Sequence, residues 1–324
     1  MEDTREFLVR LRLPPGDRHD LPSSPKRFPD GAQYRIEIPS CEGPAALRAA
    51  LEEADRHGIV VHRVSQGSGI MLLADAEIAE MARLGRERGM EVSLFVGPRA
   101  GWDTGATAVS AAGRVVAPRV RGADQLVFAV EDVRRACALG IRSVLVADDG
   151  LLWVLGEMIR AGALPRDLVL KVSVMMGGAN PASVALVERL GAGTYNIPTD
   201  LSLAQIAAIR QAVGIPLDVY VEAPDDLGGF VRHYEIPELV RVAAPVYVKF
   251  GLRNAPNIYP SGTHLEATAV ALTRERVRRA RLGVEMIRRY APGLVASEPG
   301  AAGLGVPAAS GMPEAAGGAA RRLP

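Results

Sequence analysis

The feature that most constrains this chain is a regular alternation of short apolar runs with stretches of helical periodicity. Each apolar run is β-branched or strongly hydrophobic, as buried parallel strands are. The runs begin near Tyr34, Ile59, Glu91, Arg142, Leu168, Thr194, Leu217 and Val246. After each run, apolar residues recur on one helical face, as Ala46, Leu47, Ala50 and Leu51 do after the first.

Glycines close many of the helical stretches just before the next apolar run, where a left-handed residue relieves strain at a helix C-terminus. These glycines are Gly58, Gly89, Gly140, Gly162, Gly191 and Gly214. Eight such strand–helix units predict an α/β fold with a single domain, a TIM-type (β/α)₈ barrel. A doubly wound open sheet is the alternative, although eight similar units favour closure.

The barrel is expected to cover residues 33–294. Residues 1–32 are rich in Pro, Asp and Arg, which predicts an irregular N-terminal extension, and the Ala/Gly/Pro composition of residues 295–324 predicts a disordered tail. The third unit is longer than the others. Its surplus, about 101–125, is expected to form a β-hairpin or a lid over the barrel mouth.

Charge and cysteine content limit the partners we expect. Lys and Arg number 38 against 37 Asp and Glu, so no whole-chain field favours nucleic acid. We find no run of apolar residues long enough to span a membrane and no signal peptide, and we therefore expect a soluble, cytoplasmic protein. A small-molecule substrate is the expected partner, and a homo-oligomer remains open.

In this fold the reactive groups gather where the strands end and in the loops that follow. Charged residues interrupt the apolar strands at Glu37, Lys171, Glu222 and Lys249. A buried lysine needs a carboxylate partner or a lowered pKa, so Lys–Glu pairing across the barrel interior is expected. These four residues are also the candidate catalytic groups, and the ion pairs could equally be purely structural.

Other polar residues near the predicted strand ends are candidates for substrate binding. They are Ser40, His62, Gln66, Arg99, Asp148, Asn196 and Arg253. For His62, which falls in mid-strand, a hydrogen-bonded core histidine is the competing interpretation. The cofactor is unknown. Glu222, Asp226 and His264 could ligate a divalent metal, although no tight ligand motif is present and Asp226 could instead cap a helix.

The sequence between Ser143 and Ala223 resembles that of the collagenase-like peptidase family U32. The resemblance is carried by Asp148-Asp149-Gly150, Asn180-Pro181-Ala182-Ser183, Leu190-Gly191, Leu201-Ser202-Leu203-Ala204-Gln205-Ile206 and Asp218-Val219-Tyr220-Val221-Glu222-Ala223. The N-terminal half matches the family mainly in the rhythm of its elements. The resemblance implies common ancestry and barrel geometry.

The chain departs from the family after its seventh predicted strand. Family members carry a cysteine cluster there, which has been assigned to peptidase activity in some members and to an iron–sulfur cluster in others. Here Glu222 stands where the family's histidine would be, and the following residues 224–229 contain no cysteine. Two distant thiols, Cys41 and Cys137, cannot hold a cluster, so we expect no iron–sulfur centre.

Three functions therefore compete. The first is an enzyme that acts on a small polar or anionic substrate at the barrel mouth by acid/base chemistry. The second is a peptidase-type hydrolase, as the family name implies, for which we identify no nucleophile–base pair in the sequence. The third is a non-catalytic barrel that binds a ligand or partner at the same mouth.

Overall fold

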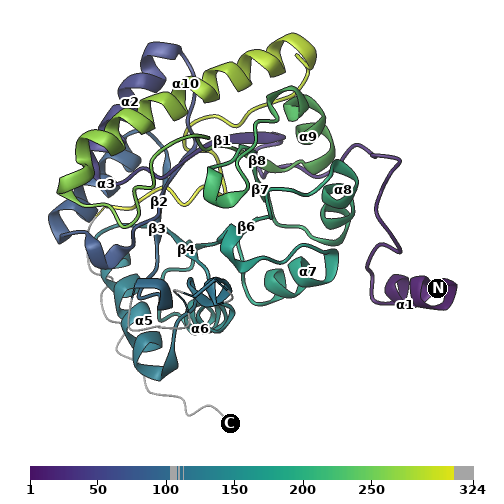
Figure 1. Ribbon diagram of the computed structural model, residues 1–324, viewed down its shortest axis with the longest axis horizontal. Coiled ribbons are helices and arrows are strands. Elements are labelled where there is room, and N and C mark those ends of the chain that lie inside the picture. Colours follow the sequence, from purple (N-terminus) through teal and green to yellow (C-terminus); the bar gives the residue numbers. More distant parts are fainter. Residues whose placement is uncertain (103–107, 109, 112, 310–324) are drawn as a thin grey trace.

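The chain folds into a closed barrel of parallel strands in the order β1 to β8, with β8 pairing back to β1 (Figure 1). A computed structural model describes residues 1–102, 108, 110–111 and 113–309. The strands are β1 (Tyr34–Pro39), β2 (Arg63–Gln66), β3 (Glu91–Phe95), β4 (Ser143–Val146), β5 (Val169–Val172), β6 (Thr194–Asn196), β7 (Leu217–Glu222) and β8 (Val246–Phe250). The predicted TIM-type barrel is confirmed.

Helices surround the barrel and cover the outer faces of its strands (Figure 1). They are α2 (Pro44–His57), α3 (Asp75–Glu87), α5 (Gly122–Ala138), α6 (Asp149–Arg160), α7 (Pro181–Arg189), α8 (Leu203–Ala212), α9 (Ile236–Ala243) and α10 (Glu266–Tyr290). The apolar core lies between the strands and these helices. None of the helices in the described ranges is long and apolar enough to cross a membrane.

Local signals in the sequence set several helix starts. Asn180 accepts a hydrogen bond from Ser183 N (2.9 Å) at the start of α7, and Ser202 accepts one from Gln205 N (3.3 Å) at the start of α8. Both are N-cap interactions that satisfy backbone donors of the first helical turn. Because each helix begins just after a strand end, these caps fix the loops that carry the mouth of the barrel.

The N-terminal extension is not irregular throughout. Residues Glu2–Arg10 form helix α1, which buries none of its residues and stands out from the barrel in Figure 1. The segment after it runs back along the barrel, where Ser24 N donates to the Arg241 carbonyl (2.9 Å).

The prediction of a disordered tail is wrong for residues 295–309, whereas 310–324 lie outside the described residues. Residues 295–309 close the N-terminal end of the barrel: Gly300 N donates to the Gly89 carbonyl (2.7 Å) and Ala308 N to the Gly140 carbonyl (2.8 Å). The glycines at these helix ends expose backbone carbonyls, and the tail satisfies them.

The long third connection contains no strand in its described part. It begins with a 3₁₀ turn at Ala100–Trp102 and continues through a second at Arg114–Val116 before α5. Its two ends are joined by hydrogen bonds from Ala100 N to the Arg119 carbonyl (3.0 Å) and from Gly101 N to the Ala117 carbonyl (2.9 Å). The predicted hairpin or lid falls partly on 103–107, 109 and 112, outside the described residues.

Candidate functional site

The interior of the barrel holds a layer of buried ions. Arg63 on β2 donates to Glu37 on β1 (Nε to Oε2, 2.8 Å) and pairs with Asp218 on β7 (Nη2 to Oδ1, 2.6 Å). Lys171 on β5 donates to Glu37 Oε1 and lies 3.7 Å from Asp218 Oδ2. None of these side chains is accessible to solvent. The predicted pairing of Glu37 with the interior lysines is therefore present.

Burial and ion pairing act in opposite directions on this layer. Burial alone would raise the pKa of Glu37, but the charges of Arg63, Lys171 and Lys249 outweigh it and hold that pKa well below its usual range. Burial, and then the charge of Arg63, lowers the pKa of Lys171 to about 7. The pKa of Lys171 is therefore closer to neutrality than that of an exposed lysine, although Lys171 does not line the mouth cavity.

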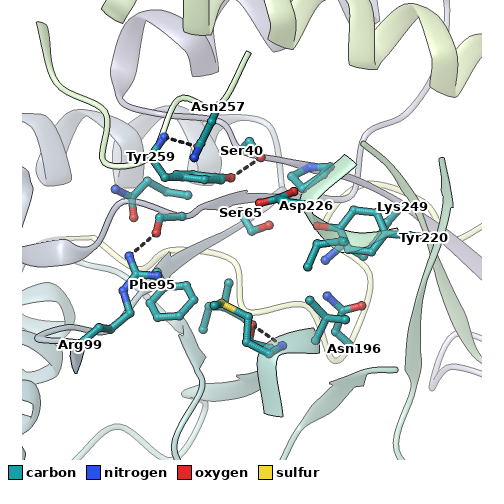
Figure 2. A pocket seen from close by; sticks show the side chains of 18 of the residues that line it. Ser40, Ser65, Phe95, Arg99, Asn196, Tyr220, Asp226, Lys249, Asn257 and Tyr259 are labelled. Carbon is teal, nitrogen blue, oxygen red and sulfur yellow. Dashed lines mark hydrogen bonds between the residues drawn. The ribbon is translucent and has the colours of Figure 1, made fainter. Parts of the chain in front are cut away.

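Above this layer, the mouth of the barrel holds a cavity of about 230 Å³, which we call the mouth cavity (Figure 2). Its walls come from the ends of all eight strands, β1 to β8, and from the loops after several of them. Its lining includes Ser40, Ser65, Gln66, Phe95, Arg99, Trp102, Ser173, Asn196, Tyr220, Asp226, Lys249, Asn257 and Tyr259. Parallel strands direct their carboxyl ends to this rim, as the fold predicts.

Lys249 connects the mouth cavity with the buried ions below it. Its Nζ lies 3.2 Å from Glu37 Oε1 and 4.3 Å from the centre of the Tyr220 ring. Asn196, in the amide orientation that satisfies both its groups, accepts from Lys249 Nζ (2.7 Å) and donates to the Asp218 carbonyl (3.1 Å). The lysine side chain is 2% exposed, so its ammonium is held in a fixed position at the cavity wall.

Arg99 lies on the opposite side of the mouth cavity from Lys249 (Figure 2). Its guanidinium stacks between two rings, with Cζ 3.8 Å from the centre of Phe95 and 3.5 Å from that of Trp102. Nη2 donates to the carbonyls of Gly67 (2.6 Å) and Ser68 (3.0 Å), and Nε is buried without a partner. Burial lowers the pKa of Arg99 to about 10. Among the described residues, no carboxylate forms an ion pair with this cation.

Tyr259, from the loop after β8, forms a wall of the cavity. Its hydroxyl donates to Ser40 Oγ, and Ser40 has a φ of 57° at the end of β1. A residue other than glycine in this left-handed region is strained, and such residues cluster at functional sites. Asp226, exposed on the loop after β7, contributes a carboxylate to the same rim.

Six predicted site residues thus line one cavity: Ser40, Gln66, Arg99, Asn196, Asp226 and Lys249. Glu37 and Lys171 belong to the ion layer beneath it. The structure places the remaining predicted site residues elsewhere.

Glu222 does not join the interior ion pairs. Its Oε2 lies 3.4 Å from His233 Nε2 and 3.7 Å from Arg279 Nε, and its Oε1 accepts from Arg253 N (3.1 Å). The pairing of β7 with β8 shifts register between Tyr220 and Glu222. Because such an irregularity interrupts the alternation of side chains, Glu222 leaves the side on which Asp218 and Tyr220 lie.

Three predicted substrate-binding residues have structural contacts instead. His62 lies near the opposite end of the barrel, where Nδ1 accepts from Ile36 N (2.9 Å) and Nε2 contacts the Ser297 carbonyl (2.7 Å). Asp148 is the N-cap of α6 and accepts from Leu151 N (2.8 Å). Arg253 is exposed and pairs with Asp225 (3.3 Å).

The predicted metal ligands are not brought together. Within the described part of the chain, no group of three or more His, Cys, Asp or Glu side chains could hold a metal ion. Glu222 faces His233, whereas His264 is exposed in the turn before α10. Glu222, Asp226 and His264 do not form such a group in the described ranges, so the metal site predicted on them has no support from the structure.

Sequence reasoning missed Arg63, Asp218 and Tyr220 as parts of the barrel interior. All three lie inside predicted strands, and Asp218 and Tyr220 are two positions apart, which places them on one side of a strand. Charged residues within apolar runs were the available signal. The two thiols are unsuited as nucleophiles, because burial raises the pKa of Cys41 and raises that of Cys137 to about 11.

Comparison with known proteins agrees with the resemblance seen in the sequence. The family described as Peptidase family U32 matches residues 119–223. This segment is similar to peptidase family U32. It contains β4 to β7 with the helices between them, and hence Lys171, Asn196 and Tyr220 of the site. No curated protein matches the chain.

Solved structures with a similar fold include the U32 peptidase Mk0906, with 19% identity, 62% of this chain and 73% of that chain covered, and a TM-score of 0.37. Another is oxaloacetate acetylhydrolase in complex with oxalate, with 9% identity, coverage of 81% and 84%, and a TM-score of 0.46. No chemistry follows from either likeness.

Proposed function

We propose that the chain is an enzyme that acts on a small anionic substrate in the mouth cavity by acid/base chemistry. Lys249 is the proton-transferring group, and Arg99 binds the anionic part of the substrate. The observation that carries the proposal is the position of these two cations on opposite sides of one cavity, with only Lys249 in contact with a carboxylate.

Arg99 has the properties of an anion-binding group. Its stacking between Phe95 and Trp102 holds the guanidinium plane in place, and its backbone contacts leave Nε without a partner. A bound carboxylate or phosphate would supply the missing negative charge through charge-assisted hydrogen bonds.

Lys249 is suited to proton transfer because Glu37 connects it with Lys171. Both amines contact Glu37 Oε1, and the pKa of Lys171 is lowered to about 7. Lys249 Nζ lies at the wall of the mouth cavity, where an amine beside a carboxylate can exchange a proton with a bound substrate. When Lys249 takes up that proton, Glu37 stabilises the resulting ammonium.

The test is a panel of small carboxylates and phosphate esters, with binding followed by thermal shift and conversion by proton NMR. We expect Lys249→Gln to retain binding and to lose at least about 100-fold in rate, the usual contribution of a positioned acid or base. Arg99→Gln should weaken binding about tenfold or more. Arg253→Gln, which breaks only an exposed ion pair, is the matched control.

The competing functions give different results in the same experiment. A non-catalytic barrel would bind members of the panel in an Arg99-dependent manner and convert none of them. A peptidase would cleave peptides and be indifferent to Lys249→Gln. Conversion at the wild-type rate by Lys249→Gln would refute the role given to Lys249.

A further inference from the structure

A second cavity, of about 240 Å³, lies beside the mouth cavity. It is enclosed by the loops that follow β7 and β8, and Ser40, Asp226, Asn257 and Tyr259 line both cavities. The wall between them therefore contains the hydrogen bond from Tyr259 to Ser40 (Figure 2). The lining of the second cavity also includes Arg276 of α10, a cation that no step of the proposed function uses.

Arg276 is a buried cation with few partners. The residue is 4% exposed; Nη1 donates to the Ser40 carbonyl (3.2 Å), and Nε is buried without a partner. Among the described residues, no carboxylate lies within 4.0 Å of its guanidinium. A buried charge without a paired group is costly in free energy, so such a cation is rarely kept unless something balances it.

The groups around Arg276 balance its charge only in part. Glu42 is the nearby carboxylate with an electrostatic influence on it, and Glu42 accepts hydrogen bonds from Gly67 N (2.6 Å) and Ser68 N (3.1 Å) instead. Tyr220 and Tyr259 also face it, and burial raises the pKa of both, so they carry no negative charge at neutral pH.

Two acidic residues line the second cavity, and neither neutralises Arg276. Asp225 instead accepts hydrogen bonds from Arg253 Nε (3.3 Å) and Asn254 N (2.6 Å). Asp226 is exposed to solvent at the rim shared by the two cavities. The buried end of the cavity is therefore positive.

We propose that the second cavity binds an anionic group, a phosphate or a carboxylate, on Arg276. Loops after the seventh and eighth strands of a TIM barrel frequently form a phosphate site, and these loops enclose the cavity here. The proposal requires no reaction at Lys249. The anion can be a free ion, or it can be one end of a substrate whose other end reaches Arg99 over the rim that the two cavities share at Asp226.

The experiment measures binding of inorganic phosphate and of succinate to the full chain by calorimetry and thermal shift, at constant ionic strength. Four variants are compared with the wild type: Arg276→Gln, Arg276→Lys, Arg99→Gln and Asp226→Asn. A compound with a phosphate at one end and a carboxylate at the other, 3-phosphoglycerate, is measured in parallel.

We expect phosphate or succinate to stabilise the wild type, and Arg276→Gln to weaken that binding about tenfold or more, as loss of a charge-assisted hydrogen bond does. Arg276→Lys should retain part of it, and Asp226→Asn should bind at least as tightly as the wild type. A free-ion site would leave the affinity for inorganic phosphate unchanged in Arg99→Gln. A bridging substrate would require both arginines for tight binding of 3-phosphoglycerate.

The proposal is overturned if none of the three compounds binds the wild type, or if binding is equal in the wild type and both Arg276 variants. If Arg276→Gln does not fold, the test rests on Arg276→Lys and Asp226→Asn. Anion affinity that is unchanged in Arg276→Lys and weaker in Asp226→Asn would refute the proposed anion site. Loss of conversion in Lys249→Gln with anion binding retained would separate this site from the proposed function.

Discussion

Lys249 Nζ lies 3.2 Å from Glu37 Oε1, an oxygen that also accepts from Lys171 and from Ser65 Oγ (2.8 Å). The other oxygen of Glu37 accepts from Arg63. One carboxylate thus links the buried ions to the residue that lines the mouth cavity. A change at Glu37 must therefore affect both the stability of the barrel and the contact that holds Lys249 at the cavity wall.

We predict that Glu37→Gln lowers the free energy of unfolding by about 3–5 kcal/mol, because it leaves buried cations without their shared anion. The cost should be measured by urea unfolding at neutral pH. Glu80→Gln, which removes a partly exposed carboxylate paired with Arg48 and Arg83, should change the free energy of unfolding far less.

The same variant has a distinct pH dependence. A depressed pKa in the folded state means that Glu37 contributes stability above the ordinary pKa of 4.5, and that this contribution is lost as the pH falls through the folded value. The stability lost by Glu37→Gln should therefore diminish in strong acid. A difference from the wild type that stays constant down to that range would contradict the ion-pair origin.

The sequence was sufficient to predict the barrel and the pairing of Glu37 with the interior lysines, because a charged residue within a buried apolar strand needs a partner of opposite charge. It did not reveal Arg63 as a further partner of Glu37. It was insufficient for Glu222, since the register shift after Tyr220 is not visible in the alternation of residues. It also could not place Arg276, which lies in an Arg-rich stretch of α10 that is typical of a solvated helix face. Only the packing of α10 against the barrel distinguishes it from its exposed neighbours.

The sequence also could not decide between the two interpretations of His62. His62 was weighed as a substrate group and as a core histidine, and the deciding contact is with Ser297, in a tail whose composition predicted disorder. Low-complexity composition describes the lack of apolar side chains. It does not show that backbone groups, such as the carbonyls of Gly89 and Gly140, will recruit the segment by hydrogen bonds.

Burial lowers the pKa of His62 from 6.5 to about 4, so the folded protein holds it neutral. The unfolded chain binds a proton between these values and the folded chain does not, so His62 makes stability fall as the pH falls from 6.5 to 4. We predict that this accounts for roughly 3 kcal/mol. In His62→Gln the fall measured by urea unfolding should be smaller by about that amount. The exposed His19, changed to Gln, is the control.

Trp102 should report binding in the mouth cavity. Its ring centre is 3.5 Å from Arg99 Cζ, whereas Trp153, the other tryptophan of the chain, is 53% exposed on α6 and does not line that cavity. An anion on Arg99 changes the field at the stacked ring. We predict a change in tryptophan emission that persists in Trp153→Phe and is lost in Trp102→Phe. A signal that follows Trp153 instead would place the anion elsewhere.

Gly67 determines where Tyr259 can lie. A Cβ at this position would be 2.5 Å from Tyr259 Cε1 and 2.8 Å from its hydroxyl, so the ring must shift and its hydrogen bond to Ser40 is disturbed. We predict that Gly67→Ala lowers the free energy of unfolding by about 1–3 kcal/mol, the usual cost of overpacking. Gly293→Ala, where the added methyl group meets open space, is the control.

A double-mutant cycle separates this overlap from other effects of the added methyl group. In a Tyr259→Ala background the ring is absent, and Gly67→Ala should then cost little, so the two changes are strongly non-additive. The free energies of unfolding of the four proteins measure this coupling. If Gly67→Ala costs the same with and without the Tyr259 ring, its effect arises from the backbone of the loop after β2, and the wall shared by the two cavities does not depend on the absence of a side chain at position 67.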